Sequence, residues 1–317
     1  MDDAFPVLPF RSTLYTPAEL FAGFRADDPA SYATTPDLRA YRSTRLGPNR
    51  EVGMLRALHD QCITEARDQF LAGRRVVAVM GGHAMSRTDP AYRQVALMAA
   101  RLTGRGDLVA SGGGPGAMEA THLGALVSPS GPAALVGALE RLAEVPRFPD
   151  GAAALVAAGG ELDPGVLAAL HAWQRPAFEV LAEVAPDARG ESLAVPTWFY
   201  GHEPPTPFAT HLAKYFSNSL REDGLLAVAA DGIVFAPGRA GTLQEVFQEA
   251  CQNYYKVFHG RFSPMAFLDT DGCWSETFPV GPLLERLFGP EDFARHIRIS
   301  PDPDELLAFL LQDHLMG

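Results

Sequence analysis

The stretch GIVFAPGRAGTLQE, residues 232–245, joins a short apolar run to a glycine turn and then to an amphipathic segment. The run at 232–236 predicts a buried strand, and the segment 241–259 predicts a long helix. Two other stretches have the same order, RRVVAVMGGH at 74–83 and DLVASGGGPGAMEA at 107–120. Short apolar strands that alternate with helices are typical of a parallel sheet covered on both faces. We therefore predict an α/β protein with a Rossmann-like, doubly wound parallel sheet.

The remaining periodicity extends this pattern along the chain. Apolar residues recur at steps of three and four in 51–71, 92–102 and 210–230, which predicts three further helices. Short apolar runs at 193–200 and 264–268 predict two further strands.

Composition divides the chain into three parts. Residues 1–50 are rich in proline and arginine and have weak periodicity, which predicts an irregular N-terminal arm packed on the main domain. Residues 51–317 are interpreted as one Rossmann-like nucleotide-binding domain. Within it, 129–196 is rich in alanine and interrupted by proline and glycine, which predicts a helical insertion.

The charge and the composition exclude several classes of protein. The net charge of −12 argues against duplex nucleic acid or an anionic membrane as a partner. A small phosphate would have to be bound locally, by backbone N–H groups and a few arginines. Three widely spaced cysteines and nine scattered histidines indicate neither a disulfide framework nor a metal site. The first ten residues lack a basic region before an apolar core, and the uncharged stretch 120–139 is broken by proline and glycine, so we expect a cytoplasmic protein.

Glycines follow three of the predicted strands. In a parallel sheet, ligands bind beyond the carboxyl ends of the strands. Glycine lets the backbone approach a ligand closely, and the helix N-terminus that follows offers unpaired N–H groups to a phosphate. Three such turns in one sheet predict a shared phosphate-binding rim, although any single turn is equally well explained as a tight connection. The rim consists of Gly81, Gly82, Gly112, Gly113, Gly114, Gly116, Gly238 and Gly241.

Other nucleotide motifs fit poorly. Gly112, Gly114 and Ala117 match the dinucleotide fingerprint, but Pro115 interrupts it and no acidic residue ends the next strand. The two lysines of the chain, Lys214 and Lys256, follow no glycine turn, which excludes a P-loop. They also lie in no context suited to a pyridoxal Schiff base.

Two polar groups of residues have both a structural and a functional interpretation. Thr242 and Glu245 have the spacing of a helix capping box, which needs no substrate, but capping does not explain Arg239 in the turn. Asn218 and Arg221 lie with Lys214 on the polar side of the predicted helix 210–230, and a solvated face is the simpler interpretation. Arg221 would reach the ligand edge of the sheet only if this helix bent inward or met a neighbouring subunit.

The pair of segments SGGGPGAMEA, 111–120, and PGRAGTLQE, 237–245, resembles the paired signature of the LONELY GUY (LOG) family of nucleotide phosphoribohydrolases. The resemblance covers about 76–268. It implies a Rossmann-like homodimer with its site near the subunit interface and no cofactor. It also implies hydrolysis of a nucleoside 5′-monophosphate to free base and ribose 5-phosphate.

The resemblance assigns roles to particular residues. Glu245 corresponds to the family's catalytic glutamate and Arg221 to its arginine, while the backbone at Gly241 and Thr242 would hold the 5′-phosphate. Arg239 replaces the second glycine of the family's P-G-G turn. The remaining residues expected to bind substrate or phosphate are the glycines of the rim, Met118, Asn218 and Arg239.

The sequence departs from the family elsewhere, and other functions remain open. Glu119 stands where many members have glycine, and the insertion at 129–196 lengthens the chain. The base could be adenine, a modified adenine such as a cytokinin, another purine or a pyrimidine. A non-catalytic nucleotide sensor with the same fold is the main alternative, and a dinucleotide-dependent oxidoreductase is a weaker one.

Overall fold

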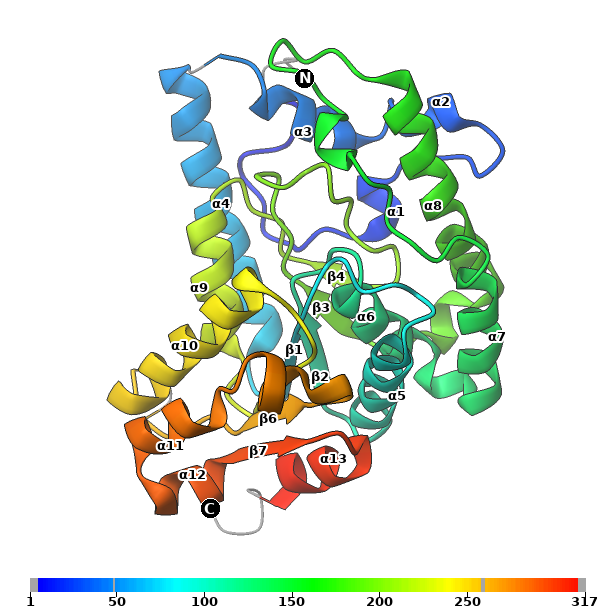
Figure 1. Cartoon of the computed structure of the whole chain (residues 1–317). Helices are drawn as coiled ribbons and strands as arrows, with labels where there is room; N and C mark the ends of the chain where they lie inside the picture. The colour runs from blue at the N-terminus through cyan, green and yellow to red at the C-terminus, as the bar shows by residue number, and fades with distance from the viewer. Residues whose placement is uncertain (1–4, 48, 258–259, 313–317) are drawn as a thin grey trace.

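The computed structural model describes residues 5–47, 49–257 and 260–312. Seven parallel strands form one sheet in the order β4-β3-β2-β1-β5-β6-β7, with helices on both faces (Figure 1). This confirms the predicted α/β, Rossmann-like doubly wound fold. The strands are β1 (Val76–Met80), β2 (Leu108–Ser111), β3 (Ser192–Ala194), β4 (His211–Leu212), β5 (Ile233–Phe235), β6 (Met265–Leu268) and β7 (Ile297–Ser300).

Helices connect the strands and extend beyond the sheet at the N-terminal end of the chain. Within the described ranges, no helix is long and apolar enough to cross a membrane. The helices are α1 (Pro17–Leu20), α2 (Pro29–Tyr32), α3 (Pro36–Thr44), α4 (Arg50–Leu71), α5 (Pro90–Gly104), α6 (Ala117–Val127), α7 (Pro132–Leu142), α8 (Pro164–Glu183), α9 (Asn218–Val228), α10 (Ala240–Tyr255), α11 (Gly281–Phe288), α12 (Pro290–His296) and α13 (Pro303–Gln312).

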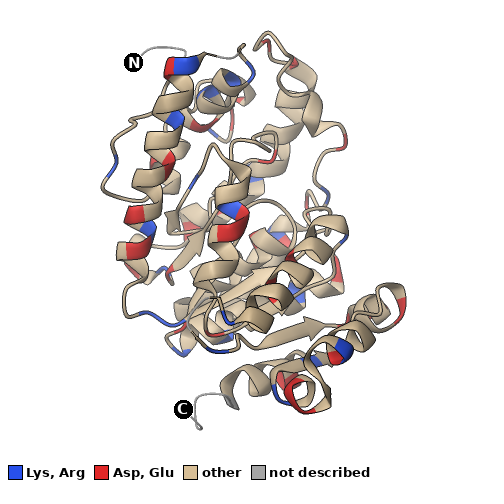
Figure 2. Cartoon of the chain, turned by 90° about the vertical axis from the view of Figure 1, so that its left-hand side faces the viewer, with Lys and Arg blue, Asp and Glu red and all other residues tan. Residues whose placement is uncertain are grey.

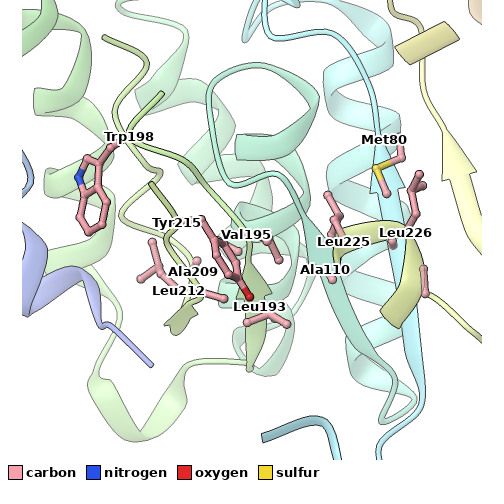
Figure 3. Packing of buried hydrophobic residues seen from close by; sticks show 14 of the residues in the cluster. Met80, Ala110, Leu193, Val195, Trp198, Ala209, Leu212, Tyr215, Leu225 and Leu226 are labelled. Carbon is pink, nitrogen blue, oxygen red and sulfur yellow. The ribbon is translucent and has the colours of Figure 1, made fainter. Parts of the chain in front are cut away.

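Alternate residues of the central strands β1, β2, β5 and β6 enter two separate apolar cores. In β1, Ala78 and Met80 face the core shared with α4, α9 and α10, while Val77 and Val79 face the core shared with α5, α6 and α13. Figure 3 shows Leu225 and Leu226 of α9 beside Met80 in the first core. Because both faces are covered, the central strands β1, β2, β5 and β6 are short and buried along their whole length.

The strand order reverses beside β1. The chain passes from β1 outward through β2, β3 and β4, and then returns to place β5 on the other side of β1. The helices after β1 and β5, which are α5 and α10, therefore pack on opposite faces of the sheet, and a crevice is expected at the carboxyl ends of these two strands. Such a reversal is where doubly wound proteins bind ligands.

Three of the predicted elements differ in the structure. The predicted helix at 210–230 begins only at Asn218, because Leu212 is paired with Ala194 of β3 and hydrogen-bonded to Tyr15. The predicted strand at 193–200 is only β3, which ends before Pro196. Strand β7 was not predicted. The helix predicted at 241–259 ends at Tyr255, and its last two residues lie outside the described part of the chain, as do residues 1–4 of the acidic N-terminus.

The N-terminal arm packs on the edge of the sheet at β4, and its described residues include three short helices where an irregular segment was expected. Tyr15 exchanges two backbone hydrogen bonds of 2.9 Å with Leu212. Asp37 accepts hydrogen bonds from the Lys214 ammonium at 2.5 Å and from the Trp198 indole at 2.9 Å. Lys214 is thus completely buried and not on a solvated helix face, because this ion pair replaces its hydration.

The region 129–196 is helical over α7 and α8 but ends in β3, so the insertion is shorter than predicted. The C-terminal half of α8 packs with α7 against the α5–α6 side of the sheet, through Ala177 and Val180. Its N-terminal half packs against the arm, where Leu167 and Leu170 join the other core. The insertion therefore connects the arm to the opposite face of the sheet.

We expect Asp37→Ala to lower the free energy of unfolding by about 3–5 kcal/mol, since it leaves the buried Lys214 ammonium without its counter-charge. The measurement is urea denaturation at neutral pH. Glu191→Ala is the control, because it breaks an exposed ion pair with Arg74 and should cost at most about 1 kcal/mol. Equal losses in the two variants would show that the buried pair does not hold the arm on the sheet.

Candidate active site

The turns after β1, β2 and β5 touch one another at the carboxyl edge of the sheet. The Gly82 N–H donates to the Pro237 carbonyl at 3.0 Å, and the Ala117 N–H donates to the Gly82 carbonyl at 3.2 Å. A Cβ on Gly116 would lie 2.3 Å from the same carbonyl oxygen. The three turns thus form one continuous rim at the strand-order reversal, as their sequence positions predict.

Packing alone explains several of the rim glycines. A Cβ on Gly81 would lie 2.6 Å from the Ala117 Cβ, and Gly113 and Gly116 have positive φ angles of 74° and 68°. Gly241 is different, since a Cβ there would meet nothing within 4 Å and its φ is not positive. Neither close packing nor backbone conformation requires glycine at 241. A ligand that approaches the helix N-terminus closely would require a small residue at this position.

Helix α10 does not begin with the predicted capping box. Its N-cap is Arg239, and no side chain caps it, so Thr242 is the third helical residue and Glu245 lies in the second turn. Thr242 instead packs under the turn, where its Oγ1 would be 2.0 Å from a Cβ on Gly238. The capping interpretation of Glu245 is therefore wrong. Helix geometry leaves the N–H groups of Ala240, Gly241 and Thr242 without acceptors in the helix.

Arg221 lies in the first turn of α9 and reaches the rim within a single chain. Because α9 begins directly after the segment that follows β4, its N-terminus lies at the carboxyl edge of the sheet. The Arg221 Nε donates to the Val195 carbonyl at 2.8 Å, and Nη2 lies 3.9 Å from the Met118 Sδ. A Cβ on Gly112 would lie 1.9 Å from Nη2, so this glycine makes room for the guanidinium.

Glu245 faces Arg221 across the crevice. The Arg221 Nη1 and Glu245 Oε1 are 4.0 Å apart, and the two side chains are 12% and 18% exposed. Burial raises the pKa of Glu245 to about 7, opposed by the charge of Arg221 and reinforced by that of Glu222. A carboxyl group whose pKa is raised to about 7 is suited to acid–base chemistry near neutral pH.

The arm and α4 fix the start of α9 through a buried carboxylate. Asp60 accepts hydrogen bonds from the backbone N–H groups of Phe216 and Ser217 at 2.9 and 2.8 Å, directly before α9 begins. The His59 ring lies between Asp60, at 3.0 Å, and the Tyr15 hydroxyl, at 2.8 Å. This chain of contacts holds the first turn of α9 and, with it, Arg221.

The other predicted residues occupy different places. Asn218 begins α9 and donates to Glu222 at 2.7 Å, next to the Arg221–Glu245 pair. Met118 lies over the glycine turn that follows β2, with its Cε 3.0 Å from the position of a Cβ on Gly114. Arg239 is exposed at the N-terminus of α10.

Glu119, which departs from the family pattern, lies outside the crevice. Its carboxylate is fully buried and receives two hydrogen bonds from Arg87, at 2.8 and 2.7 Å, and one from the Tyr92 hydroxyl at 2.8 Å. Arg87 in turn donates to the carbonyls of Val145 and Trp173. Glu119 therefore has a structural role, in which it ties the insertion to α6.

Sequence reasoning missed Glu203, which lies in the connection between β3 and β4. Its Oε2 is 3.6 Å from the position of a Cβ on Gly114, and its Oε1 is 3.9 Å from the His83 Nδ1. Burial raises the pKa of Glu203, opposed by the charges of His83 and Arg221. No sequence pattern marks this residue, because only the fold brings its proline-rich loop onto the second glycine turn.

A cavity of about 510 Å³ adjoins Glu203. It lies between the turn after β1, at His83, and residues 147–153 of the insertion. Its size is within the range of about 300–1,000 Å³ usual for small-molecule sites. Within the described residues, no three His, Cys, Asp or Glu side chains are grouped as metal ligands.

No protein-family model matches this chain, and no curated protein matches its sequence. The fold and the site therefore define its class by themselves. It is a Rossmann-like α/β protein whose glycine-rich rim adjoins an arginine and two carboxylates at the strand-order reversal.

We expect the free energy of unfolding of Glu245→Gln to increase relative to that of the unmodified protein as the pH rises from about 4.5 to 7. The folded-state pKa of about 7 exceeds the ordinary value of 4.5, so the glutamate stabilises the fold only while it is protonated. Glutamine does not titrate, and the Arg221 charge is constant over this range. The change should be on the order of 1–3 kcal/mol.

The measurement is urea denaturation of both proteins at closely spaced pH values between 4 and 9. Glu191→Gln, an exposed carboxylate at the opposite edge of the sheet, controls for the loss of a negative charge. A difference for Glu245→Gln that stays constant with pH would mean that the Glu245 carboxyl group is well solvated.

Proposed function

We propose that this protein is a nucleotide phosphoribohydrolase of the LOG type, which hydrolyses the N-glycosidic bond of a nucleoside 5′-monophosphate to free base and ribose 5-phosphate. The observation that supports this most is the Glu245 carboxylate. It lies 4.0 Å from the Arg221 guanidinium, beside a glycine rim at the strand-order reversal, and it has no capping role.

The 5′-phosphate would bind at the N-terminus of α10. The N–H groups of Ala240, Gly241 and Thr242 have no acceptors within the helix, and the positive end of the helix dipole favours an anion there. The open space at Gly241 allows a phosphate oxygen to approach the backbone. The exposed Arg239 side chain is placed to contribute a second, charged contact.

The ribose would then lie over the second glycine turn, with C1′ near Glu245. As the C1′–N bond breaks, positive charge develops on the ribose, and an ionised carboxylate beside it stabilises that charge. A water molecule bonds to C1′, its proton passes to Glu245, and the departing base takes up a proton from solvent. Arg221 keeps Glu245 oriented and supports its ionised form.

We also propose a homodimer formed through α9 and α10. Figure 2 shows acidic and basic residues mixed on the side of the molecule that carries these helices. Large apolar side chains are exposed there as well, which is typical of an interface. They are Leu220, Phe247, Tyr254 and Tyr255, with exposed fractions of 49%, 38%, 53% and 74%.

We expect Glu245→Gln and Arg221→Ala each to lower kcat/KM by about 10²–10⁴ for the preferred nucleotide. The assay follows free base and ribose 5-phosphate with a panel of nucleoside 5′-monophosphates that includes isopentenyl-AMP. Glu191→Gln and Arg74→Ala, which separate a surface ion pair at the amino edge of the sheet, are the matched controls. Both should retain full activity.

One outcome would decide against hydrolysis, and another would decide against the role of Glu245. If the unmodified protein binds nucleotides but releases no base, the site is that of a sensor. If it releases base and Glu245→Gln remains fully active, the carboxylate is not part of the reaction.

We expect kcat/KM of the unmodified protein to rise with pH and to level off above about 7, because the ionised form of Glu245 is the active one. Initial rates at low nucleotide concentration between pH 5 and 9 give this profile. The rise should be absent from the residual activity of Glu245→Gln. An optimum on the acidic side of pH 6 would contradict the proposed role of the carboxylate.

A further inference from the structure

The wall of the cavity beside Glu203 is held in place by hydrogen bonds to the rest of the chain. Its outer wall, residues 147–153, follows Pro146, whose carbonyl accepts hydrogen bonds from the Arg87 N–H at 2.9 Å and from the Ser86 hydroxyl at 3.3 Å. Arg87 is itself fixed by its buried ion pair with Glu119. The insertion is thereby held against the turn that follows β1.

Glu203 is held at the end of this cavity that faces the reaction centre. The Thr206 N–H donates to the Gly113 carbonyl at 2.8 Å, which ties the loop of Glu203 to the second glycine turn. The carboxylate lies against Gly114, two residues from the Gly112 that adjoins Arg221. A nucleotide whose ribose lies over this turn would direct its base past Glu203 and into the cavity.

The chemistry of the cavity favours a ligand that donates hydrogen bonds. Its acidic side chains are Glu203, Asp89 and Asp150, and its basic side chains are Arg147, His83 and His202. Within the described part of the chain, the Glu203 carboxylate accepts no hydrogen bond, and its side chain is only 19% exposed. A mostly buried carboxylate without a hydrogen bond is stabilised by a ligand that donates an N–H to it. A ligand that presents an acceptor leaves it unpaired.

We propose that this cavity binds the base of the nucleotide and that Glu203 selects bases with an exocyclic amino group over their oxo counterparts. This inference rests on the proposed function, and it assigns a specificity to the same site. The amino group of adenine or cytosine donates to the Glu203 carboxylate, whereas the oxygen at the same position of hypoxanthine or uracil faces it as an acceptor. Phe148 contributes an apolar wall to the cavity. Its ring packs edge-on against that of Trp173, with the ring centroids 5.1 Å apart.

The test compares AMP with IMP and CMP with UMP. In each pair an exocyclic amino donor becomes an oxygen acceptor, and the adjacent ring nitrogen changes from an acceptor to an N–H donor. The unmodified protein should favour AMP over IMP, and CMP over UMP, in kcat/KM by about 10–100-fold, as expected for a hydrogen bond to a charged group. In Glu203→Gln the amide can also donate to the oxygen, so both ratios should fall to about one or below. Glu191→Gln should keep the ratios of the unmodified protein.

A second variant tests the location of the base. Ala153 is an exposed small residue of the cavity wall, and Ala153→Trp should weaken AMP binding by at least about tenfold, or 1.4 kcal/mol, because the indole fills the cavity. Binding of ribose 5-phosphate, which has no base, should be unchanged. Calorimetric titration with the two ligands measures both effects.

The outcomes separate this inference from the proposed function. No amino preference in the unmodified protein, or a preference that Glu203→Gln keeps, would overturn the inference while leaving hydrolysis intact. If the unmodified protein cleaves no nucleotide, hydrolysis fails, and the AMP-to-IMP ratio of dissociation constants then tests the role of Glu203 alone. Equal weakening of AMP and ribose 5-phosphate by Ala153→Trp would show that the base does not enter the cavity.

Discussion

The close contact between the turns after β1, β2 and β5 is the constraint on which the rest of the site depends. The Gly82 carbonyl accepts from the first N–H of α6, and a Cβ on Gly116 would lie only 2.3 Å from it. Only glycine allows the backbones to approach so closely. This contact sets the spacing between the N-termini of α6 and α10, and hence the width of the crevice at the reversal of the strand order.

One cation organises the charges around this crevice. Arg221 lies 4.0 Å from Glu245, and its charge, after that of His83, opposes the rise that burial causes in the pKa of Glu203. Burial is the main cause of the raised pKa of about 7 at Glu245. The carboxylates also differ in surroundings: Glu245 lies in the second turn of the helix whose N-terminus would hold phosphate, and Glu203 lines the cavity beside the insertion. A substrate with an anionic end and a hydrogen-bond-donating end matches this arrangement.

The arm and the insertion support the site from outside the sheet. The arm contributes Tyr15 to the contacts that fix Asp60 and the start of α9. The insertion contributes the cavity wall and is tied to the sheet by Arg87 and Glu119. Hydrogen bonds offset the cost of burying the Arg87–Glu119 pair. At the Lys214–Asp37 pair, one carboxylate oxygen accepts from both Lys214 and Trp198, and the other oxygen has no partner among the described residues.

The sequence by itself determined the sheet class, the three glycine turns and the placement of Glu245 in the helix after β5. Local apolar periodicity and glycine position are sufficient for these, since they follow from the pattern of a single strand, turn and helix. The tertiary structure alone decided where α9 begins, because pairing of Leu212 with Ala194 and Tyr15 overrides the helical pattern of 210–217. It also decided that Lys214 is buried, that Glu245 faces Arg221, and that Glu203 adjoins Gly114. Those relations join segments far apart in the chain, and only the packing of the sheet, the arm and the insertion brings them together.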